Sequence, residues 1–232
     1  MKTNSIKMIL LFSLAIIIIS CETNDDPVMT YASASIETTN ENAEKTYTTI
    51  KINGIVSSDG GSSIINRGIC WSVDPNPTIE NSLILESNNN FSNIVNDLLV
   101  NTSYYFRTFA TNEIGTSYSE QRIINTLSIN NTSWKLTTVY TSQNDFEIFA
   151  KLDFFDNNTT KFDEMDLPGQ GPGFFLTFGT WSLEGNNLTY IWEGSDPTNT
   201  TYLYTGIVNG MSISGDYTHG SLPNGIWSAI HF

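Results

Sequence analysis

After about residue 45, apolar and polar residues alternate with a period of two along most of the chain. In the segment 46–56, Thr48, Ile50 and Ile52 lie on one face of an extended strand. β-Branched and aromatic residues fill these runs, and turns rich in Gly, Asn and Asp separate them. No long apolar stripe repeats at the 3.6-residue period of a helix. The pattern therefore predicts an all-β protein.

The predicted strands fall into two groups, separated by the polar segment Ser128-Ile129-Asn130-Asn131. The first group occupies residues 28–127, and turn residues at Ser57–Gly61 and Asp74–Pro77 close its first two strands. The composition changes after residue 131, so we interpret 128–131 as a linker between two domains. Strands of the first domain are expected at 46–56, 68–73, 104–112 and 115–126.

Residues 132–232 contain a denser set of strand signals. Tight turns at Gly185-Asn186-Asn187 and Asn209-Gly210 join neighbouring strands, and the second is typical of a type I′ hairpin. Such connections predict an up-and-down meander, which at this strand number tends to close into a barrel. Because many aromatic residues must be placed inside, we expect side chains to fill it. The strands are expected at 134–140, 146–154, 159–165, 174–180, 181–183 with 188–192, 201–208, 211–218 and 226–232.

The N-terminus has the pattern of an export signal. Lys2 and Lys7 precede the apolar run 8–19, which is shorter than the roughly 20 residues that a membrane-spanning helix needs. The run ends at Ser20-Cys21 and resembles the lipobox of bacterial lipoproteins. The resemblance implies that residues 1–20 are a signal peptide, that Cys21 carries diacylglycerol, and that its amino group is acylated, usually with palmitate.

An acidic segment, 21–27, follows the cysteine. Glu22, Asp25 and Asp26 resemble the signal that directs some outer-membrane lipoproteins to the cell surface. A flexible solvated tether is the alternative interpretation. We therefore expect a lipid-anchored protein of the outer membrane, exposed at the cell surface.

The charge and the cysteine content argue against a nucleic-acid partner and against a disulfide-stabilised fold. Removing residues 1–20 takes away two lysines and no acids, which leaves 8 Lys+Arg against 24 Asp+Glu and a formal charge of −16. Such a chain is repelled by phosphate backbones, so we expect no nucleic-acid partner. With Cys21 lipidated, Cys70 has no intramolecular partner and no disulfide framework can form. No pattern predicts a cofactor.

A set of residues late in the first domain has a characteristic spacing: Leu98, Thr102, Tyr104, Phe106, Arg107, Ala110, Asn112 and Gly115. At this spacing, residues 28–127 resemble fibronectin type III domains, a family of β-sandwiches. The resemblance implies that Tyr104 forms a tyrosine corner, in which its hydroxyl bonds to backbone a few residues upstream, and that Trp71 lies in the core. Val100 departs from the family, which usually has proline there. For function the resemblance implies little, because these sandwiches serve as spacers, adhesive modules and enzyme accessories.

Residues 132–232 resemble bacterial lipocalin-like domains, which are small β-barrels that sometimes hold an apolar ligand. The resemblance rests on Ser133-Trp134-Lys135-Leu136 and on Gly179-Thr180-Trp181-Ser182-Leu183 with the Asn-containing turn that follows. A barrel of eight strands is either filled by side chains or holds one small ligand, and both readings stay open at this point.

Aromatic residues of the second domain are the candidate ligand contacts. Their rings are suited to stacking against sugars, but alternation with leucines on the same faces equally predicts core packing. The set is Trp181, Tyr190, Trp192, Tyr202 and Tyr204.

Carboxylates of the second domain are the candidate metal ligands. Their oxygens suit calcium, although their spacing does not match an EF-hand loop, and a charged outer face of a hairpin is the alternative. Paired carboxylates could also serve a hydrolase, if a cleft brought two of them face to face. His219 and His231 belong to no metal or catalytic-triad motif. The calcium set is Asp153, Asp156, Asp163 and Asp166.

We interpret the chain as a non-catalytic binding protein of the cell envelope, attached to the membrane through its lipid. The first domain is expected to be a spacer, and the second to bind a glycan, a small apolar ligand or a protein. A surface hydrolase of polysaccharide or peptide, and a purely structural or adhesive envelope protein, are the alternatives.

Overall fold

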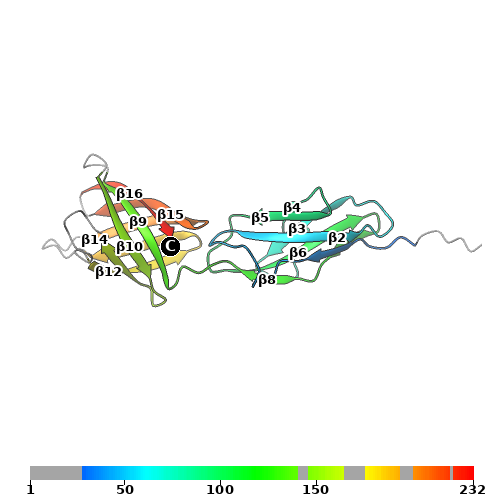
Figure 1. Ribbon diagram of the computed structural model, residues 1–232, viewed down its shortest axis with the longest axis horizontal. Helices are drawn as coiled ribbons and strands as arrows, with labels where there is room; N and C mark the ends of the chain where they lie inside the picture. The colour runs from blue at the N-terminus through cyan, green and yellow to red at the C-terminus, as the bar shows by residue number, and fades with distance from the viewer. Residues whose placement is uncertain (1–27, 141–145, 165–175, 194–200, 220–221) are drawn as a thin grey trace, which may run out of the picture.

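The computed structural model describes residues 28–140, 146–164, 176–193, 201–219 and 222–232. The predicted signal peptide, Cys21 and the predicted acidic tether lie outside these residues. The regular elements that it describes are β-strands, arranged as a sandwich and a barrel along one long axis (Figure 1). The chain is therefore all-β, as the alternation predicts. Within the described residues, no helix is long and apolar enough to cross a bilayer.

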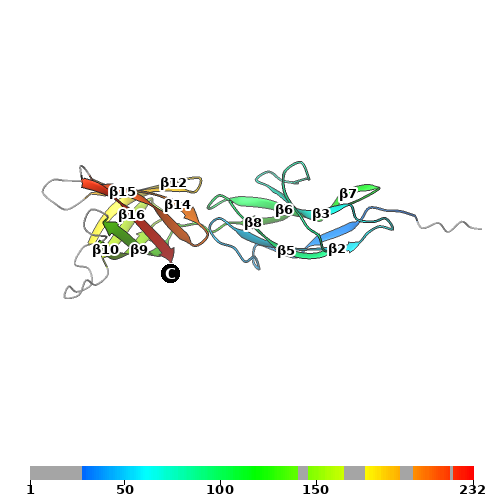
Figure 2. The ribbon, with the colours of Figure 1, turned by 90° about the horizontal axis from the view of Figure 1, so that it is seen from above.

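The sandwich consists of two antiparallel sheets. Its three-stranded sheet has the order β1 (Ser33–Ile36), β2 (Ile50–Ser58), β5 (Asn90–Val95). The five-stranded sheet has the order β4 (Ser82–Leu85), β3 (Asn66–Ser72), β6 (Ser103–Asn112), β7 (Gly115–Tyr118), with β8 (Arg122–Asn125) also paired to β6. Figure 2 shows the two sheets facing each other, and buried aliphatic and aromatic residues fill the space between them.

Two sequence predictions for the sandwich need correction. The strand predicted at 46–56 begins only at Ile50, because residues 46–49 form a turn in which the Thr46 N–H donates to the Thr49 carbonyl. The strand predicted at 115–126 is two strands, interrupted where Ser119 bonds back to β6: its Oγ accepts from the Thr108 N–H, and its carbonyl accepts from Arg107.

Tyr104 and Trp71 occupy different positions relative to the sandwich core. The Tyr104 hydroxyl accepts a hydrogen bond from the Leu99 N–H at 2.9 Å, five residues upstream. Trp71, expected inside the core, is only half-buried and packs against its rim. The reason is that Trp71 pairs with Ser82, the first residue of the four-residue strand β4, so the sheet ends beside it.

The second unit is a closed antiparallel barrel in which β16 pairs with β9. Neighbours in sequence are neighbours in space, as expected for a meander, and Figure 1 shows the barrel at the end of the sandwich. The strands are β9 (Thr132–Tyr140), β10 (Phe146–Phe154), β11 (Thr159–Glu164), β12 (Leu176–Glu184), β13 (Asn187–Glu193), β14 (Thr201–Asn209), β15 (Ser212–His219) and β16 (Leu222–His231).

Two details of the barrel differ from the prediction. The segments predicted at 174–180 and 181–183 belong to one strand, β12, because the inward alternation of Thr177 and Trp181 continues without a break. The β14–β15 loop is Gly210-Met211 rather than Asn209-Gly210. In this loop Gly210 has φ 59° and Met211 is not in the positive-φ region. This excludes type I′ and fits type II′, which places glycine first.

Aromatic side chains fill most of the barrel interior. Tyr190 and Tyr204 stack with ring centroids 4.3 Å apart, and the Trp227 ring meets both edge-on. Small residues make room for these rings: a Cβ added at Gly206 would lie 2.7 Å from Trp227 Cζ2. The middle of the barrel is thus packed like an ordinary protein interior.

Two barrel hairpins hold the sandwich at the junction. The Asn186 side chain, at the tip of β12–β13, accepts from the Val100 N–H (3.0 Å) and donates to the Leu98 carbonyl (2.9 Å). In the β14–β15 loop, Gly210 donates to Thr48 Oγ1 (2.8 Å) and its carbonyl accepts from the Tyr47 N–H (3.2 Å). The junction therefore has two separate attachment points besides the linker.

Tyr47 extends the barrel core into the sandwich. Its ring is 1% exposed and lies 5.1 Å from the Trp134 ring and 5.6 Å from that of His231. Burial raises the pKa of its hydroxyl to about 12, although a hydrogen bond with Thr132 acts in the opposite direction. Ile129 of the linker is buried in the same cluster, so the core is continuous across the junction.

Candidate functional site

We call the barrel end away from the sandwich the mouth. It is formed by the strand ends opposite to those that the 185–186 and 210–211 hairpins connect. Tyr140, Glu164, Trp192, Tyr202 and His219 stand at or next to these ends. Residues 141–145, 165–175, 194–200 and 220–221, which connect these strand ends in sequence, lie outside the described residues.

A pocket of about 110 Å³ opens among the described residues of the mouth. Most of its wall is aromatic or aliphatic, and Glu164 contributes the carboxylate of the described lining. Pockets that bind small molecules commonly combine an apolar wall with a few polar groups that orient the ligand. The lining residues are Tyr140, Ile148, Phe162, Glu164, Trp192 and Tyr202.

One side of the mouth is a continuous stack of rings. Trp192 and Tyr202 are directly opposite in the β13–β14 register, and their rings are 3.9 Å apart and tilted by only 4°. The His219 ring continues the stack 3.7 Å from Tyr202, and Phe162 lies 5.8 Å from Trp192 on the other side. Since neighbouring rings cover the faces of Trp192 and Tyr202, this wall is rigid and presents mainly ring edges.

Burial changes the acid–base behaviour of the mouth. Desolvation raises the pKa of Glu164 above its usual value, because the charged carboxylate loses water. Desolvation also raises the pKa of Tyr140, with smaller contributions from Tyr204, Tyr217, Tyr202 and Glu164. Loss of water therefore opposes ionisation of both groups.

His219 leaves a polar atom without a partner at the same end. The side chain is 8% exposed, and its Nε2 has no hydrogen-bond partner among the described residues. Buried polar groups in native proteins are nearly always bonded, so such an atom is a site where a ligand or water group can be accommodated.

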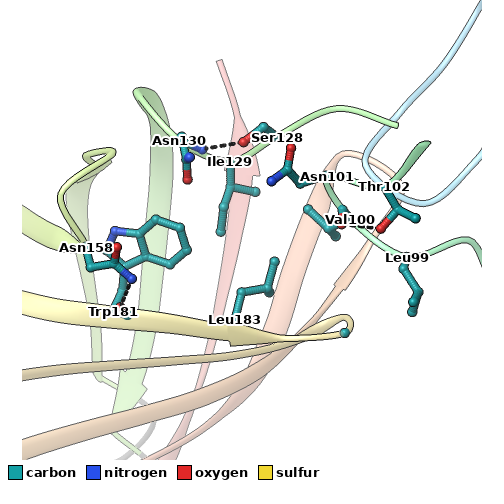
Figure 3. A pocket seen from close by; sticks show the side chains of 11 residues that line it. Leu99, Val100, Asn101, Thr102, Ser128, Ile129, Asn130, Asn158, Trp181 and Leu183 are labelled. Carbon is teal, nitrogen blue, oxygen red and sulfur yellow. Dashed lines mark hydrogen bonds between the residues drawn. The ribbon is translucent and has the colours of Figure 1, made fainter. Parts of the chain in front are cut away.

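A second pocket, of about 340 Å³, lies at the junction of the two domains (Figure 3). The 99–102 loop of the sandwich, the linker 128–130 and the barrel all contribute to it. Its barrel side includes Asn158, Trp181 and Leu183. The Trp181 Nε1 donates to the Phe155 carbonyl at 3.0 Å, which fixes the indole ring at one end of the pocket.

The predicted aromatic ligand set is divided among three places. Trp192 and Tyr202 line the mouth pocket, and Trp181 lines the junction pocket. Tyr190 and Tyr204 are 0% and 1% exposed and stack on each other inside the barrel, where they contribute to its core. The structure thus supports the core interpretation for these two residues.

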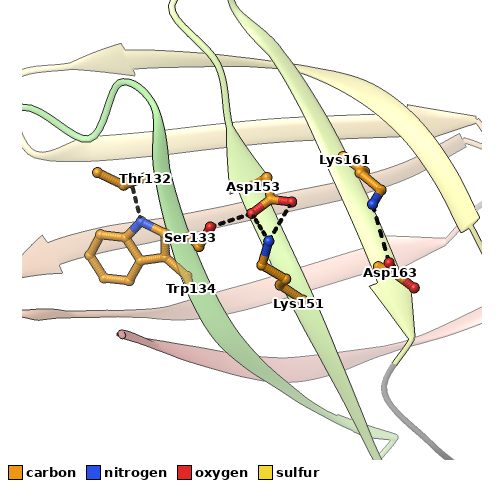
Figure 4. Close-up of polar contacts among 7 residues, drawn as sticks. All are labelled: Thr132, Ser133, Trp134, Lys151, Asp153, Lys161 and Asp163. Atoms are coloured by element: carbon orange, nitrogen blue, oxygen red, sulfur yellow. Dashed lines mark hydrogen bonds and ion pairs between the residues drawn. The ribbon is translucent and has the colours of Figure 1, made fainter. Parts of the chain in front are cut away.

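The predicted calcium set is not brought together among the described residues. Asp153 pairs with Lys151 at 2.8 Å and accepts from the Ser133 hydroxyl, while Asp163 pairs with Lys161 at 3.2 Å (Figure 4). Asp156 accepts from the Asn131 side chain in a separate loop. Asp166 lies outside the described residues. Within them, no group of three or more His, Cys, Asp or Glu side chains is placed to hold a metal ion.

Sequence reasoning missed Tyr140, Phe162, Glu164 and His219 as mouth residues. Tyr140 and Phe162 were interpreted as ordinary strand residues, Glu164 as one of several carboxylates in an acidic stretch, and His219 as a histidine without a motif. The available signal was positional: all four lie near strand ends on the same side of the meander, opposite the hairpins at 185–186 and 210–211. In a closed barrel these ends meet at one opening.

Comparisons with known proteins give little further information. No family profile and no characterised protein matches the chain. Among solved structures, the chain is similar to the Burkholderia oklahomensis agglutinin, with 8% sequence identity and a TM-score of 0.21. The alignment covers 87% of this chain and 84% of the agglutinin. At this TM-score the likeness carries no argument about function.

Proposed function

We propose that the protein is a lipid-anchored, non-catalytic binding protein of the bacterial cell envelope, whose barrel binds a small ligand at its mouth. The observation that carries the proposal is the aromatic pocket with the half-buried Glu164 carboxyl group, at the end of the barrel remote from the sandwich. The ligand class is a small, largely apolar molecule with one polar group that faces Glu164.

In finer terms, the sandwich is a fibronectin type III-like spacer and the barrel is lipocalin-like. The bond from the Leu99 N–H to the Tyr104 hydroxyl supports the first assignment, because it has the form of a tyrosine corner. The closed eight-stranded meander supports the second assignment.

The direction in which the chain runs along the molecule is consistent with anchoring at Cys21. The described chain enters the sandwich at the end away from the barrel, so the sandwich stands between residue 28 and the mouth (Figure 1). We expect mass spectrometry of membrane-extracted protein to find a chain that begins at a lipidated Cys21. An intact 1–20 segment, or an unmodified Cys21, would show that the anchoring part of the proposal is wrong.

Thermal unfolding of the full chain with a ligand panel tests the mouth. The panel contains fatty acids, alkylamines, small aromatic alcohols, and calcium as a separate arm. A ligand that binds only the native state at 100 times its Kd adds about 2.7 kcal/mol of stability, which raises the unfolding midpoint. We expect a dose-dependent rise with one apolar class.

Variants at the mouth make the test specific. Glu164→Gln keeps the shape of the side chain but cannot ionise, so it should weaken binding of the responding ligand and change its pH dependence. Glu147→Gln, on β10, is the matched control, because Glu147 does not line the pocket. A ligand response that Glu164→Gln leaves unchanged, or no response to any class, would favour the structural or adhesive alternative.

A hydrolase would require a second carboxylate facing Glu164. The part of the pocket wall that the structure describes contains Glu164 as its acidic residue, and we do not propose catalysis.

A further inference from the structure

The pocket at the junction is built jointly by both domains. The sandwich contributes Leu99, Val100, Asn101 and Thr102, and the barrel contributes Asn158, Trp181, Leu183 and Gly185. Its volume of about 340 Å³ is in the usual range for small-molecule sites. Because the hairpin bonds of Asn186 and the buried Tyr47 ring fix the two domains together, the two walls of the pocket have a defined separation.

The chemistry of the lining is distinctive for this chain. All of the lining side chains are uncharged, although the sequence contains 24 acidic residues. The polar lining consists of amides and hydroxyls, from Asn101, Thr102, Ser128, Asn130 and Asn158. A charged ligand finds no counter-charge in this wall, whereas a neutral ligand with hydroxyl groups finds both donors and acceptors.

Two of these amides are free to bond to a ligand. The exposed side chains of Asn101 and Asn130 hydrogen-bond to no group among the described residues, whereas Asn158 Nδ2 donates to the Trp181 carbonyl. Each free amide offers two donor hydrogens and one acceptor oxygen. Asn101 comes from the sandwich loop and Asn130 from the linker, and Figure 3 shows both on the same side of the pocket as Ser128.

Apolar groups complete the wall. The indole of Trp181 lies beside Ile129 and Leu183 (Figure 3). Ile129 is 1% exposed and belongs to the junction core, so the indole and its neighbours hold their positions without a ligand. A preformed wall lowers the entropy cost of binding.

The geometry points to a binding site for neutral sugars at the junction pocket, separate from the mouth and independent of the function proposed for it. One or two neutral sugar units occupy the pocket, with an apolar C–H face against Trp181 and Leu183 and their hydroxyls bonded to the amides of Asn101 and Asn130. Because neither domain alone provides the whole wall, the site exists only in the two-domain chain.

The test is a titration of the full chain with methyl glycosides of glucose, galactose and mannose, and with maltose, cellobiose and lactose. Saturation-transfer NMR identifies the ligand that binds, and calorimetry gives its Kd. We expect at least one neutral sugar to bind, and glucuronic acid, the charged analogue of glucose, to bind at least tenfold more weakly.

The test variant is Asn101→Asp combined with Asn130→Ala. Asn101 has φ 52°, a conformation that aspartate tolerates, so the backbone of the loop is preserved. Loss of the amide donors should weaken sugar binding by about tenfold or more. The matched control is Glu164→Gln at the mouth, which should leave the sugar Kd unchanged.

Three results would overturn the inference: no sugar in the panel binds, the double variant binds with an unchanged Kd, or Glu164→Gln removes sugar binding. The last result would place the sugar at the mouth. A failed mouth ligand screen with intact sugar binding would reject the proposed function while leaving this site in place, so the two proposals are tested separately.

Discussion

Val100, where the fibronectin type III sequence pattern has proline, makes a hydrogen bond that proline could not make. Its N–H donates to Asn186 Oδ1 across the junction. Proline has no N–H, so the usual family residue could not make this bond. The departure therefore marks a contact with the second domain.

Val100→Pro should lower the free energy of unfolding by about 1 kcal/mol, the net value of one hydrogen bond. Chemical denaturation of the full chain measures this change. In an Asn186→Ala background the same substitution should cost much less, because the acceptor is already gone. Equal costs in the two backgrounds would show that the bond does not account for the effect.

The buried thiol of Cys70 should make the folding stability depend on pH. The thiol is buried, and burial raises its pKa from 9.0 to about 11, while Arg107 acts in the opposite direction. Between pH 9 and about pH 11, the Cys70 thiol ionises in the unfolded chain but keeps its proton in the folded chain. Folding stability should therefore fall as the pH rises from about 9 to about 11, and Cys70→Ala should lose that component.

Alkylation of the thiol checks the burial of Cys70 directly. In a Cys21→Ser chain, Cys70 is the remaining cysteine. Iodoacetamide at pH 8.5 should modify it slowly in the native protein and at the rate of a free thiol in urea. Rapid native modification would contradict the buried position.

At the scale of elements, the barrel depends on glycines that face large rings. In β14, Gly206 leaves room for the Trp227 ring, and an added Cβ would lie 2.7 Å from Cζ2 of that ring and 2.9 Å from the Ser214 carbonyl. Gly206→Ala should therefore destabilise the protein by about 1–3 kcal/mol, the usual cost of overpacking. Ser214→Ala, an exposed change on the paired strand β15, is the control and should stay within about 0.5 kcal/mol.

The strands of the barrel could be predicted from the sequence because they are long and alternate strictly. The sandwich strands β1, β4 and β5 were missed, since they have only four to six residues, too few for a clear alternation, and Ser or Asn interrupts the apolar residues of β1 and β5. Register was the other missing quantity, because period-2 patterns do not say which residues of different strands meet.

The missing register also limited what could be predicted about the residues of the mouth. Trp192 and Tyr202 could be predicted as candidate ligand contacts because aromatic rings are suited to stacking against ligands. Phe162 and Glu164 could not, because their relation to Trp192 follows from the order of strands around the closed barrel. The junction pocket was equally inaccessible, since it needs the relative position of two domains.

At the scale of the whole molecule, Tyr47 should make unfolding cooperative. This sandwich residue is buried against Trp134 and His231 of the barrel. We expect the full chain to unfold in a single calorimetric transition. Tyr47→Ala, which leaves a cavity that typically costs about 3–5 kcal/mol for an aromatic residue, should separate the transition into two. Tyr47→Phe keeps the ring and should retain one transition, and two transitions in the unmodified chain would contradict the coupling.

The paired hairpin attachments also restrict rotation. A linker alone would let the barrel swivel about the long axis, but contacts at Asn186 and Gly210 resist torsion at two separate points. The orientation of the barrel relative to the sandwich is then set by the junction itself. Under the proposed anchoring at Cys21, a longer or shorter 21–27 segment would change the distance of the barrel from the bilayer, while the orientation of its mouth relative to the sandwich would stay constant.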